Sequence, residues 1–159
     1  MNKKFTLTNE TIQHNGHTLH RIKALRDFSD VKKDDIGGWV ETETNLSQYG
    51  DCWVYNDAKV YDNARVFNNA KMSGKAEVYD KAKICDNVWI WNHAKISGEA
   101  IVYENAVVGG YVEVTGFVEI GRGSRLSGAV RFDGDTTISN LHLTECQDTD
   151  YYEKQHTKL

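Results

Sequence analysis

The chain has 159 residues, a formal net charge of −4 at pH 7, thirteen glycines and no proline. This length suits one domain, and without a basic tract the chain is not expected to bind nucleic acids in general. No window is apolar enough to cross a membrane, and the start MNKKFTLTNETIQHNG lacks the apolar run of a signal peptide.

The three cysteines, Cys52, Cys85 and Cys146, are odd in number and form no CxxC motif. A disulfide framework normally needs an even set, and a metal or redox site normally needs closely spaced pairs. The cysteines therefore predict a reduced, cytoplasmic protein.

Residues 1–36 are predicted to cap the N-terminal end of the fold with a β-hairpin. The segment TIQHNGHTLHRI has two alternating runs around Asn15-Gly16, a dipeptide typical of type I′ hairpin turns. His14 and His17 flank this turn and His20 follows them. A metal would need more ligands at suitable spacing, so we interpret the histidines as polar hairpin residues and expect no metal site.

Residues 37–141 are predicted to form the body of the fold, because a six-residue period runs through them without slipping from Cys52 to Ile138. The aliphatic positions of this period are Val54, Val60, Val66, Met72, Val78, Ile84, Ile90, Ile96, Val102, Val108, Val114, Ile120, Leu126, Phe132 and Ile138. A small residue stands two positions before most of them, as in Ala58 and Ala64. A fixed hexapeptide period is typical of a parallel β-helix. In each of its short strands the small residue and the aliphatic residue point inward, and the residue between them points outward.

The outward charges set the length of one coil at three hexapeptides, or 18 residues. At this spacing Lys59, Glu77, Lys95, Glu113 and Arg131 form one column in which the signs alternate. A spacing of 12 would stack lysines on lysines, which is unfavourable between adjacent strands. The asparagines Asn69, Asn87 and Asn105 also fall in one column, as an asparagine ladder requires. We therefore expect an all-β solenoid of about five regular coils after an irregular first turn around Val40 and Leu46.

The units VYDNAR, VYDKAK and ISGEAI resemble the hexapeptide-repeat superfamily. That resemblance implies a left-handed parallel β-helix of triangular section. The opening LHRIKALRDFSDVKKDDIGGWVETETNLSQYGDCWVY is also similar to uncharacterised phage and bacterial hexapeptide-repeat proteins that often carry a transferase label. The label rests on the repeat, and a fold with many functions does not by itself supply a mechanism.

Residues 142–159 leave the repeat and are predicted to form an irregular C-terminal cap or tail. Tyr151 and Tyr152 are the residues of this segment that could fold back over the last coil. The final residues are expected to fray, as chain ends commonly do.

One catalytic hypothesis follows from the resemblance. The best-known members of the superfamily are trimeric acyltransferases that bind acyl-CoA between neighbouring helices and use a histidine as general base. His93 is the one histidine inside the regular repeat, at a corner between Lys75 and Tyr111, with Glu99 as the nearest candidate acid. No loop interrupts the period to wall a pocket, so an exposed corner residue is the favoured interpretation of His93. The histidine set of the superfamily's zinc carbonic anhydrases has no counterpart in this sequence.

A second hypothesis comes from the outward aromatic residues, which gather on one face. The predicted face carries Trp53, Tyr55, Lys71, Trp89, Trp91 and Val107. Clustered exposed aromatics usually mark an interface, and tryptophan is enriched in binding hot spots. Three interpretations are open: contact with another copy of the chain, a site around Lys71 for a planar anionic ligand or a protein, and partial cover by the hairpin or tail.

The preferred prediction is a non-enzymatic binding or scaffold protein that forms a dimer or trimer, or binds a protein or nucleotide, through this face. No cofactor is expected under this prediction. The phage resemblance suggests a role against host defence by sequestering a protein or a nucleotide signal. The alternative is an acyltransferase that uses acyl-CoA with His93 as base.

Overall fold

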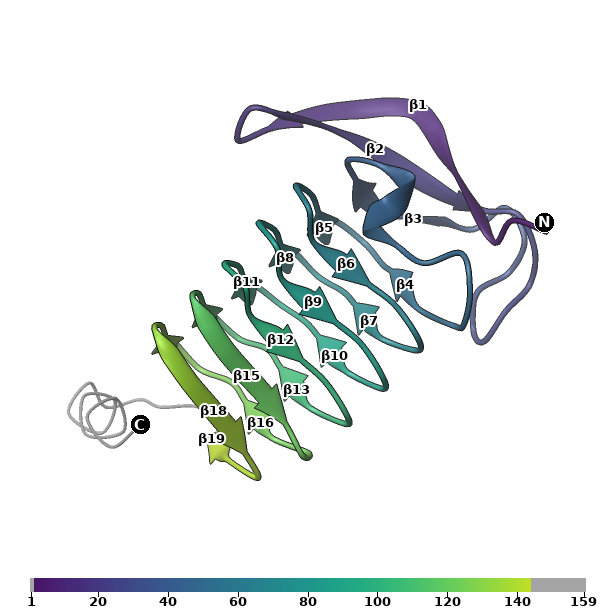
Figure 1. Cartoon of the computed structure of the whole chain (residues 1–159). Helices are drawn as coiled ribbons and strands as arrows, with labels where there is room; N and C mark the ends of the chain where they lie inside the picture. Colours follow the sequence, from purple (N-terminus) through teal and green to yellow (C-terminus); the bar gives the residue numbers. More distant parts are fainter. Residues whose placement is uncertain (1, 144–159) are drawn as a thin grey trace.

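The protein is a parallel β-solenoid with an antiparallel hairpin at its N-terminal end (Figure 1). A computed structural model describes residues 2–143. Within this range the elements are strands apart from one 3-10 turn, η1 (Glu43–Asn45). In Figure 1 the near strands run towards the lower right while the coils advance towards the C-terminus, so the chain winds in a left-handed sense. The all-β fold and the handedness implied by the resemblance are both confirmed.

The N-terminal strands are β1 (Phe5–His14), β2 (His17–Ala24) and β3 (Ile36–Val40). The coil strands are β4 (Trp53–Val54), β5 (Lys59–Val60), β6 (Arg65–Val66), β7 (Lys71–Met72), β8 (Glu77–Val78), β9 (Lys83–Ile84), β10 (Trp89–Ile90), β11 (Lys95–Ile96), β12 (Ile101–Val102), β13 (Val107–Val108), β14 (Glu113–Val114), β15 (Phe117–Gly121), β16 (Arg125–Leu126), β17 (Arg131–Phe132), β18 (Asp135–Ser139) and β19 (His142–Leu143).

Three sheets form the three sides of the solenoid. They have the orders β3-β5-β8-β11-β14-β17, β4-β7-β10-β13-β16-β19 and β6-β9-β12-β15-β18, and β1 and β2 extend the first of them. Each regular strand pairs in parallel with the strand three elements later, as in Lys59 with Glu77 and Trp89 with Val107. These pairs are 18 residues apart, which confirms the predicted coil length.

The core is a column of small and aliphatic side chains inside the coils. Every aliphatic position of the period from Val54 to Ile138 is buried, and so are the alanines that precede them. Each six-residue unit then needs a sharp corner. The corner residues adopt a positive φ at every sixth position over much of the chain, and they are mainly Asn, Asp or Gly. These residue types tolerate the left-handed region, so the sequence meets the backbone demand of the triangular coil.

Side chains on the outside stack from coil to coil as the sequence predicts. The column of alternating charges is present, and its last pair places Arg131 Nη1 3.8 Å from Glu113 Oε2. The asparagine ladder is present in its first step, where Asn69 Nδ2 donates to Asn87 Oδ1 at 3.3 Å. Such ladders repeat the same interaction at each level and favour one register.

The predicted hairpin is confirmed. Strands β1 and β2 pair antiparallel with His14 opposite His17, and both turn residues, Asn15 and Gly16, have a positive φ. Strand β2 then pairs antiparallel with β3, and β3 pairs in parallel with β5. The hairpin thus continues one side of the solenoid beyond its first coil.

The direction of the hydrogen bonds determines what the N-terminal cap must supply. Each coil donates its backbone N–H groups to carbonyls of the following coil, as in Lys59 N to Ala76 O at 2.9 Å. No earlier coil donates to the carbonyls of the first coil, so the cap must supply the donors, since buried backbone groups are normally paired. Backbone N–H groups of the cap supply some of them, as in Trp39 N to Ala58 O and Ser47 N to Val66 O, both at 3.0 Å.

Side chains of the cap supply further donors. Lys4 Nζ donates to Cys52 O at 2.7 Å and to Gly50 O at 3.2 Å, and Arg21 Nη1 donates to Asn56 O at 2.7 Å. Asn45 Nδ2 donates to Ala64 O at 2.9 Å and to Asp62 O at 3.1 Å. Lys4 and Asn45 are both fully buried. The cap is therefore built around side-chain donors as well as a strand.

At the other end the coil continues two residues past the predicted boundary. His142 and Leu143 form β19 and pair with Arg125 and Leu126, a spacing of 17 residues instead of 18. Tyr151 and Tyr152, predicted to lie over the last coil, fall outside the described residues. Within residues 2–143 no helix is both long and apolar enough to cross a membrane.

Candidate functional site

The predicted aromatic column has the expected register. Trp53 pairs with Lys71, Lys71 with Trp89, and Trp89 with Val107, at successive levels of one sheet. Because strands alternate, Tyr55 and Trp91 point outward beside their neighbours Trp53 and Trp89. The structure therefore brings together the residues that the sequence assigned to this face.

The prediction that Trp53 is exposed is wrong. Its indole is 1% exposed, because the N-terminal segment lies over it. The Phe28 ring meets the indole edge-on at 5.3 Å between ring centroids, and the Phe5 ring does so at 6.3 Å. The alternative of partial cover by the N-terminal part of the chain is thus correct for this tryptophan.

The same segment also forms hydrogen bonds with the side chains of Lys71 and Tyr55. Lys71 Nζ lies 3.2 Å from Asp30 Oδ1 and 3.1 Å from Ser29 Oγ, and Tyr55 Oη donates to the same Asp30 carboxylate at 2.6 Å. The hydrogen bond from Tyr55, with that from Lys71, lowers the pKa of Asp30. Burial, with the nearby carboxylate, raises the pKa of Tyr55. The Lys71 charge is thus balanced within the chain, which weakens the prediction of an anion site there.

The open part of the face is the aromatic patch, which we define as Tyr55, Trp89, Trp91 and Val107. Trp89 is 39% exposed, and its ring stacks on that of Tyr55 at 6.3 Å between centroids. Trp91 lies flat on the backbone of Gly109, where an added Cβ would fall 2.1 Å from its Cε2. Its buried Nε1 has no hydrogen-bond partner among residues 2–143. Trp89 is therefore the exposed ring of the patch, and the side chains beside it are partly buried.

The other predicted candidate, His93, is an exposed corner residue. Its ring stacks on the Tyr111 ring at 4.7 Å between centroids, as the 18-residue spacing predicts. Glu99, the proposed acid, pairs instead with Lys81 at 3.8 Å. Among the described residues no carboxylate orients the imidazole, which a general base in this position would need.

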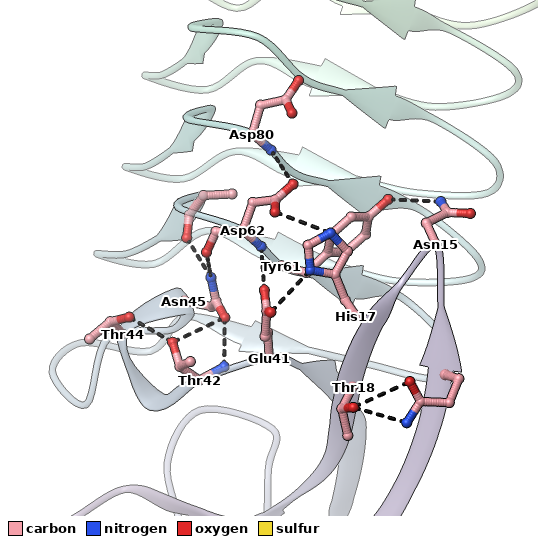
Figure 2. A network of polar contacts seen from close by, with 12 residues as sticks. Asn15, His17, Thr18, Glu41, Thr42, Thr44, Asn45, Tyr61, Asp62 and Asp80 are labelled. Carbon is pink, nitrogen blue, oxygen red and sulfur yellow. Dashed lines mark hydrogen bonds and ion pairs between the residues drawn. The ribbon is translucent and has the colours of Figure 1, made fainter.

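A polar cluster that the sequence did not predict lies where the hairpin meets the first coil (Figure 2). His17 Nδ1 is 3.0 Å from Glu41 Oε1, and His17 Nε2 is 3.2 Å from Asp62 Oδ1. Glu41 Oε2 also accepts a 2.7 Å hydrogen bond from the Asp62 backbone N–H. His17, Glu41 and Asp62 lie far apart in the sequence, so no spacing motif marks the cluster.

The geometry of this cluster favours a charged imidazole. Each ring nitrogen faces a different carboxylate, and only the imidazolium can donate from both nitrogens. The hydrogen bond to Glu41 and the charge of Asp62 raise the pKa of His17. Although burial opposes it, the bonds from His17 and Asp62 N lower the pKa of Glu41. His17 thus ties the hairpin to the coil electrostatically.

The same three side chains are also the residues best placed to hold a metal ion. Their donor atoms lie within 4.8 Å of one another, although the sequence predicted no metal site. A metal would have to displace the proton from one ring nitrogen, because ligating imidazole is neutral. In the structure both nitrogens are at hydrogen-bond distance from carboxylates, so the arrangement serves docking of the hairpin.

A second histidine reinforces this contact. His14 Nε2 lies 3.1 Å from Glu77 Oε2, and Tyr61 Oη donates to the same oxygen at 3.1 Å. The rings of His14 and His17 both pack against Tyr61, at 5.5 and 5.0 Å between centroids. The histidines of the hairpin are therefore partly buried contacts with the coil, where the sequence had suggested plain polar residues.

Comparisons with known proteins point to the repeat. A family model described as the YdcK beta solenoid repeat matches residues 58–74. A segment of 37 residues is 49% identical to the "Uncharacterized acetyltransferase YdcK" of Escherichia coli (strain K12). This match covers 23% of the chain and 11% of that protein. Together with the fold, both matches confirm the resemblance to hexapeptide-repeat proteins.

Proposed function

We propose that the chain is a non-enzymatic binding protein that pairs with a second copy of itself through the aromatic patch. The observation that carries the proposal is the exposed ring of Trp89, which lies beside Trp91 and Val107 on one side of the solenoid. Covering apolar surface of this kind lowers the free energy of the system, and tryptophan commonly anchors such contacts.

The arrangement of charges around the patch favours a second copy as the occupant. Trp89 is the third of six stacked levels that begin at Trp53 and end at His142, so Trp53 lies two levels above it and Arg125 two levels below it. Asp30 is bonded to Lys71, one level above Trp89, and Arg125 is exposed two levels below Trp89. A two-fold axis through Trp89 would place Asp30 of one copy beside Arg125 of the other, so the face complements itself in charge.

The size of the face predicts a weak complex. Six levels spaced about 4.8 Å apart and a side of about six extended residues give a footprint of roughly 580 Å². Stable interfaces bury about 800 Å² on each partner. Pairing through this face should therefore depend on concentration, with dissociation in the micromolar range.

Light scattering on variants tests the proposal. The exposed part of Trp89 is about 100 Å², since 39% of a tryptophan surface of about 250 Å² is exposed. Burying it contributes about 2 kcal/mol in each copy at about 25 cal/mol per Å². Trp89→Ala should therefore raise the dimer dissociation constant at least about a hundredfold.

Two further variants complete the experiment. Arg125→Glu should weaken pairing because it places like charges together at the rim. Phe117→Ala, a control at an exposed aromatic outside the patch, should leave the mass unchanged. Self-association through this face is refuted if the wild type and Trp89→Ala give the same mass at every concentration.

A second candidate function, acyl transfer from acyl-CoA with His93 as base, is favoured by the E. coli relative, which is named as an uncharacterised acetyltransferase. A trimer could complete the site by bringing an acid from another copy to His93. The candidate predicts that calorimetry detects CoA binding and that His93→Ala abolishes turnover of acetyl-CoA without changing the fold. If the wild type binds no CoA, this candidate is excluded.

The narrower idea that a phage or prophage carries the protein to sequester a host protein or nucleotide signal rests on the resemblance alone. It predicts that the protein purified from its native cell retains such a partner in native mass spectrometry. A preparation that contains only this chain would argue against it.

A further inference from the structure

The side of the solenoid formed by β6, β9, β12 and β15 breaks the charge pattern seen on the first side. On the β5-β8-β11 side every cation of the column pairs with an acid on the neighbouring strand. On the β6-β9 side Arg65 pairs directly with Lys83, two cations on adjacent strands. Like charges in this position destabilise a sheet. A pair that opposes stability is a reason to look for a bound anion.

Both cations are available to a ligand. The Arg65 and Lys83 side chains are exposed, and neither makes a hydrogen bond or ion pair with any residue in the range 2–143. The next side chain in the same column is Ile101, which offers no charge to either of them. Their charges are thus uncompensated on this side of the coil.

The two cations stand between two hollows of the surface. One hollow has a volume of about 450 Å³ and is lined mainly by apolar surface from the turn after β3, including Leu46, together with Val66 and Phe67. The other, of about 620 Å³, lies over Asn63, Lys81, Glu99 and Ile101. Arg65 and Lys83 line both hollows. Volumes of this size match those of small-molecule sites.

The acids near the two hollows are already paired. Glu43, on the rim of the smaller hollow, lies 3.0 Å from Lys3 Nζ. Glu99, in the larger hollow, lies 3.8 Å from Lys81 Nζ. These pairs leave Arg65 and Lys83 as the net positive charge of the region.

We propose that the groove formed by these two hollows, with Arg65 and Lys83 between them, binds an organic phosphate with a planar apolar body, such as a nucleoside monophosphate. The phosphate bridges the Arg65 guanidinium and the Lys83 ammonium, which adjacent strands hold about 4.8 Å apart at their backbones. A guanidinium matches phosphate oxygens in two-pronged geometry, and an ammonium adds a point charge. The apolar body lies in the smaller hollow against Phe67, since bases stack on aromatic rings.

This assignment is independent of self-association, because the groove and the aromatic patch lie on different sides of the solenoid. It also differs from the site that the sequence suggested around Lys71. There the cation is balanced by Asp30, whereas here two cations have no acid beside them.

Isothermal titration with adenosine 5′-monophosphate, adenosine and inorganic phosphate tests the proposal on the full chain. We expect the monophosphate to bind at least about tenfold more tightly than either part alone, since charge and stacking both contribute. No heat from the monophosphate would overturn the proposal. Equal affinity for inorganic phosphate would overturn the assignment to an organic phosphate.

Variants show whether the stacked cations are responsible. Lys83→Gln and Arg65→Gln should each raise the dissociation constant about ten- to a hundredfold, the usual effect of losing one charged hydrogen bond. Lys95→Gln is the matched control, because Lys95 lies on another side between Glu77 and Glu113. Equal losses in all three variants would overturn the proposal.

Thermal unfolding with and without the monophosphate distinguishes a ligand site from a pair that has only a structural role. Lys83→Glu places an acid beside Arg65, so without ligand the variant should melt at or above the wild-type temperature. It should also lose the upward shift that the monophosphate gives the wild type. A wild-type shift that persists in Lys83→Glu would place the ligand elsewhere and overturn the proposal.

Discussion

Replacing Asn45 tests whether side-chain donors of the cap hold the first coil together. Asn45 is fully buried, donates to Asp62 O and Ala64 O, and accepts a 2.8 Å hydrogen bond from Thr42 N at Oδ1 (Figure 2). Asn45→Ala removes these three bonds and a longer, weaker one from Thr42 Oγ1 to Asn45 Oδ1 at 3.4 Å.

The expected cost follows from the burial of each orphaned group. The bond to Ala64 O is buried, and an unsatisfied buried carbonyl costs about 2 kcal/mol. The bonds to Asp62 O and from Thr42 N are partly buried, so water can replace them at about 0.5 kcal/mol each. The sum is about 3 kcal/mol, a large share of the 5–15 kcal/mol that typically stabilises a domain.

Urea unfolding followed by circular dichroism measures this cost. With a slope of about 2 kcal/mol per molar, the midpoint of Asn45→Ala should fall by about 1.5 M. Thr44→Ala is the control, because Thr44 is exposed and its hydroxyl bonds, among residues 2–143, only to Thr42 Oγ1 at 2.7 Å. A free energy of unfolding for Asn45→Ala within about 0.5 kcal/mol of this control would refute the reasoning.

Three other predictions concern the cap and the patch. The raised pKa of His17 means that its stabilisation is complete below 6.5, its ordinary pKa, and is lost as the pH rises through the higher folded value. Thermal unfolding should therefore show a larger advantage of wild type over His17→Gln at acidic than at alkaline pH, and a constant difference would contradict this. Lys4→Met should cost about 2–4 kcal/mol in chemical unfolding by orphaning Cys52 O and Gly50 O, whereas a neutral result would show that water satisfies them. Gly109→Ala should cost about 1–3 kcal/mol because its Cβ overlaps Trp91, and adding Trp91→Ala should remove most of that cost. Additive effects of the two changes would count against that contact.

The sequence predicts the solenoid well because every unit repeats the same local demands. The aliphatic positions must face inward, the corner residues must tolerate a positive φ, and the charges of Lys59 and Glu77 select an 18-residue coil. The Asn15-Gly16 turn is equally local. These features depend on residues that are close in sequence or related by the period, so one chain suffices to predict them.

The sites depend on contacts outside the period, and these were harder to predict. Trp53 is buried because Phe28 and Phe5 reach it from the cap, and no rule of the repeat fixes the path of that segment. The cluster of His17 with Glu41 and Asp62 has the same origin. The stacked pair Arg65 and Lys83 was visible in the 18-residue register, but the hollows beside it required the structure.

The central claim, that the aromatic patch pairs two copies, is tested most directly by equilibrium sedimentation of the wild-type chain from about 1 to about 200 µM, the range that brackets a micromolar dissociation constant. We predict a mass that rises with concentration from 18.1 kDa towards twice that value. A mass of one chain at every concentration would contradict the claim.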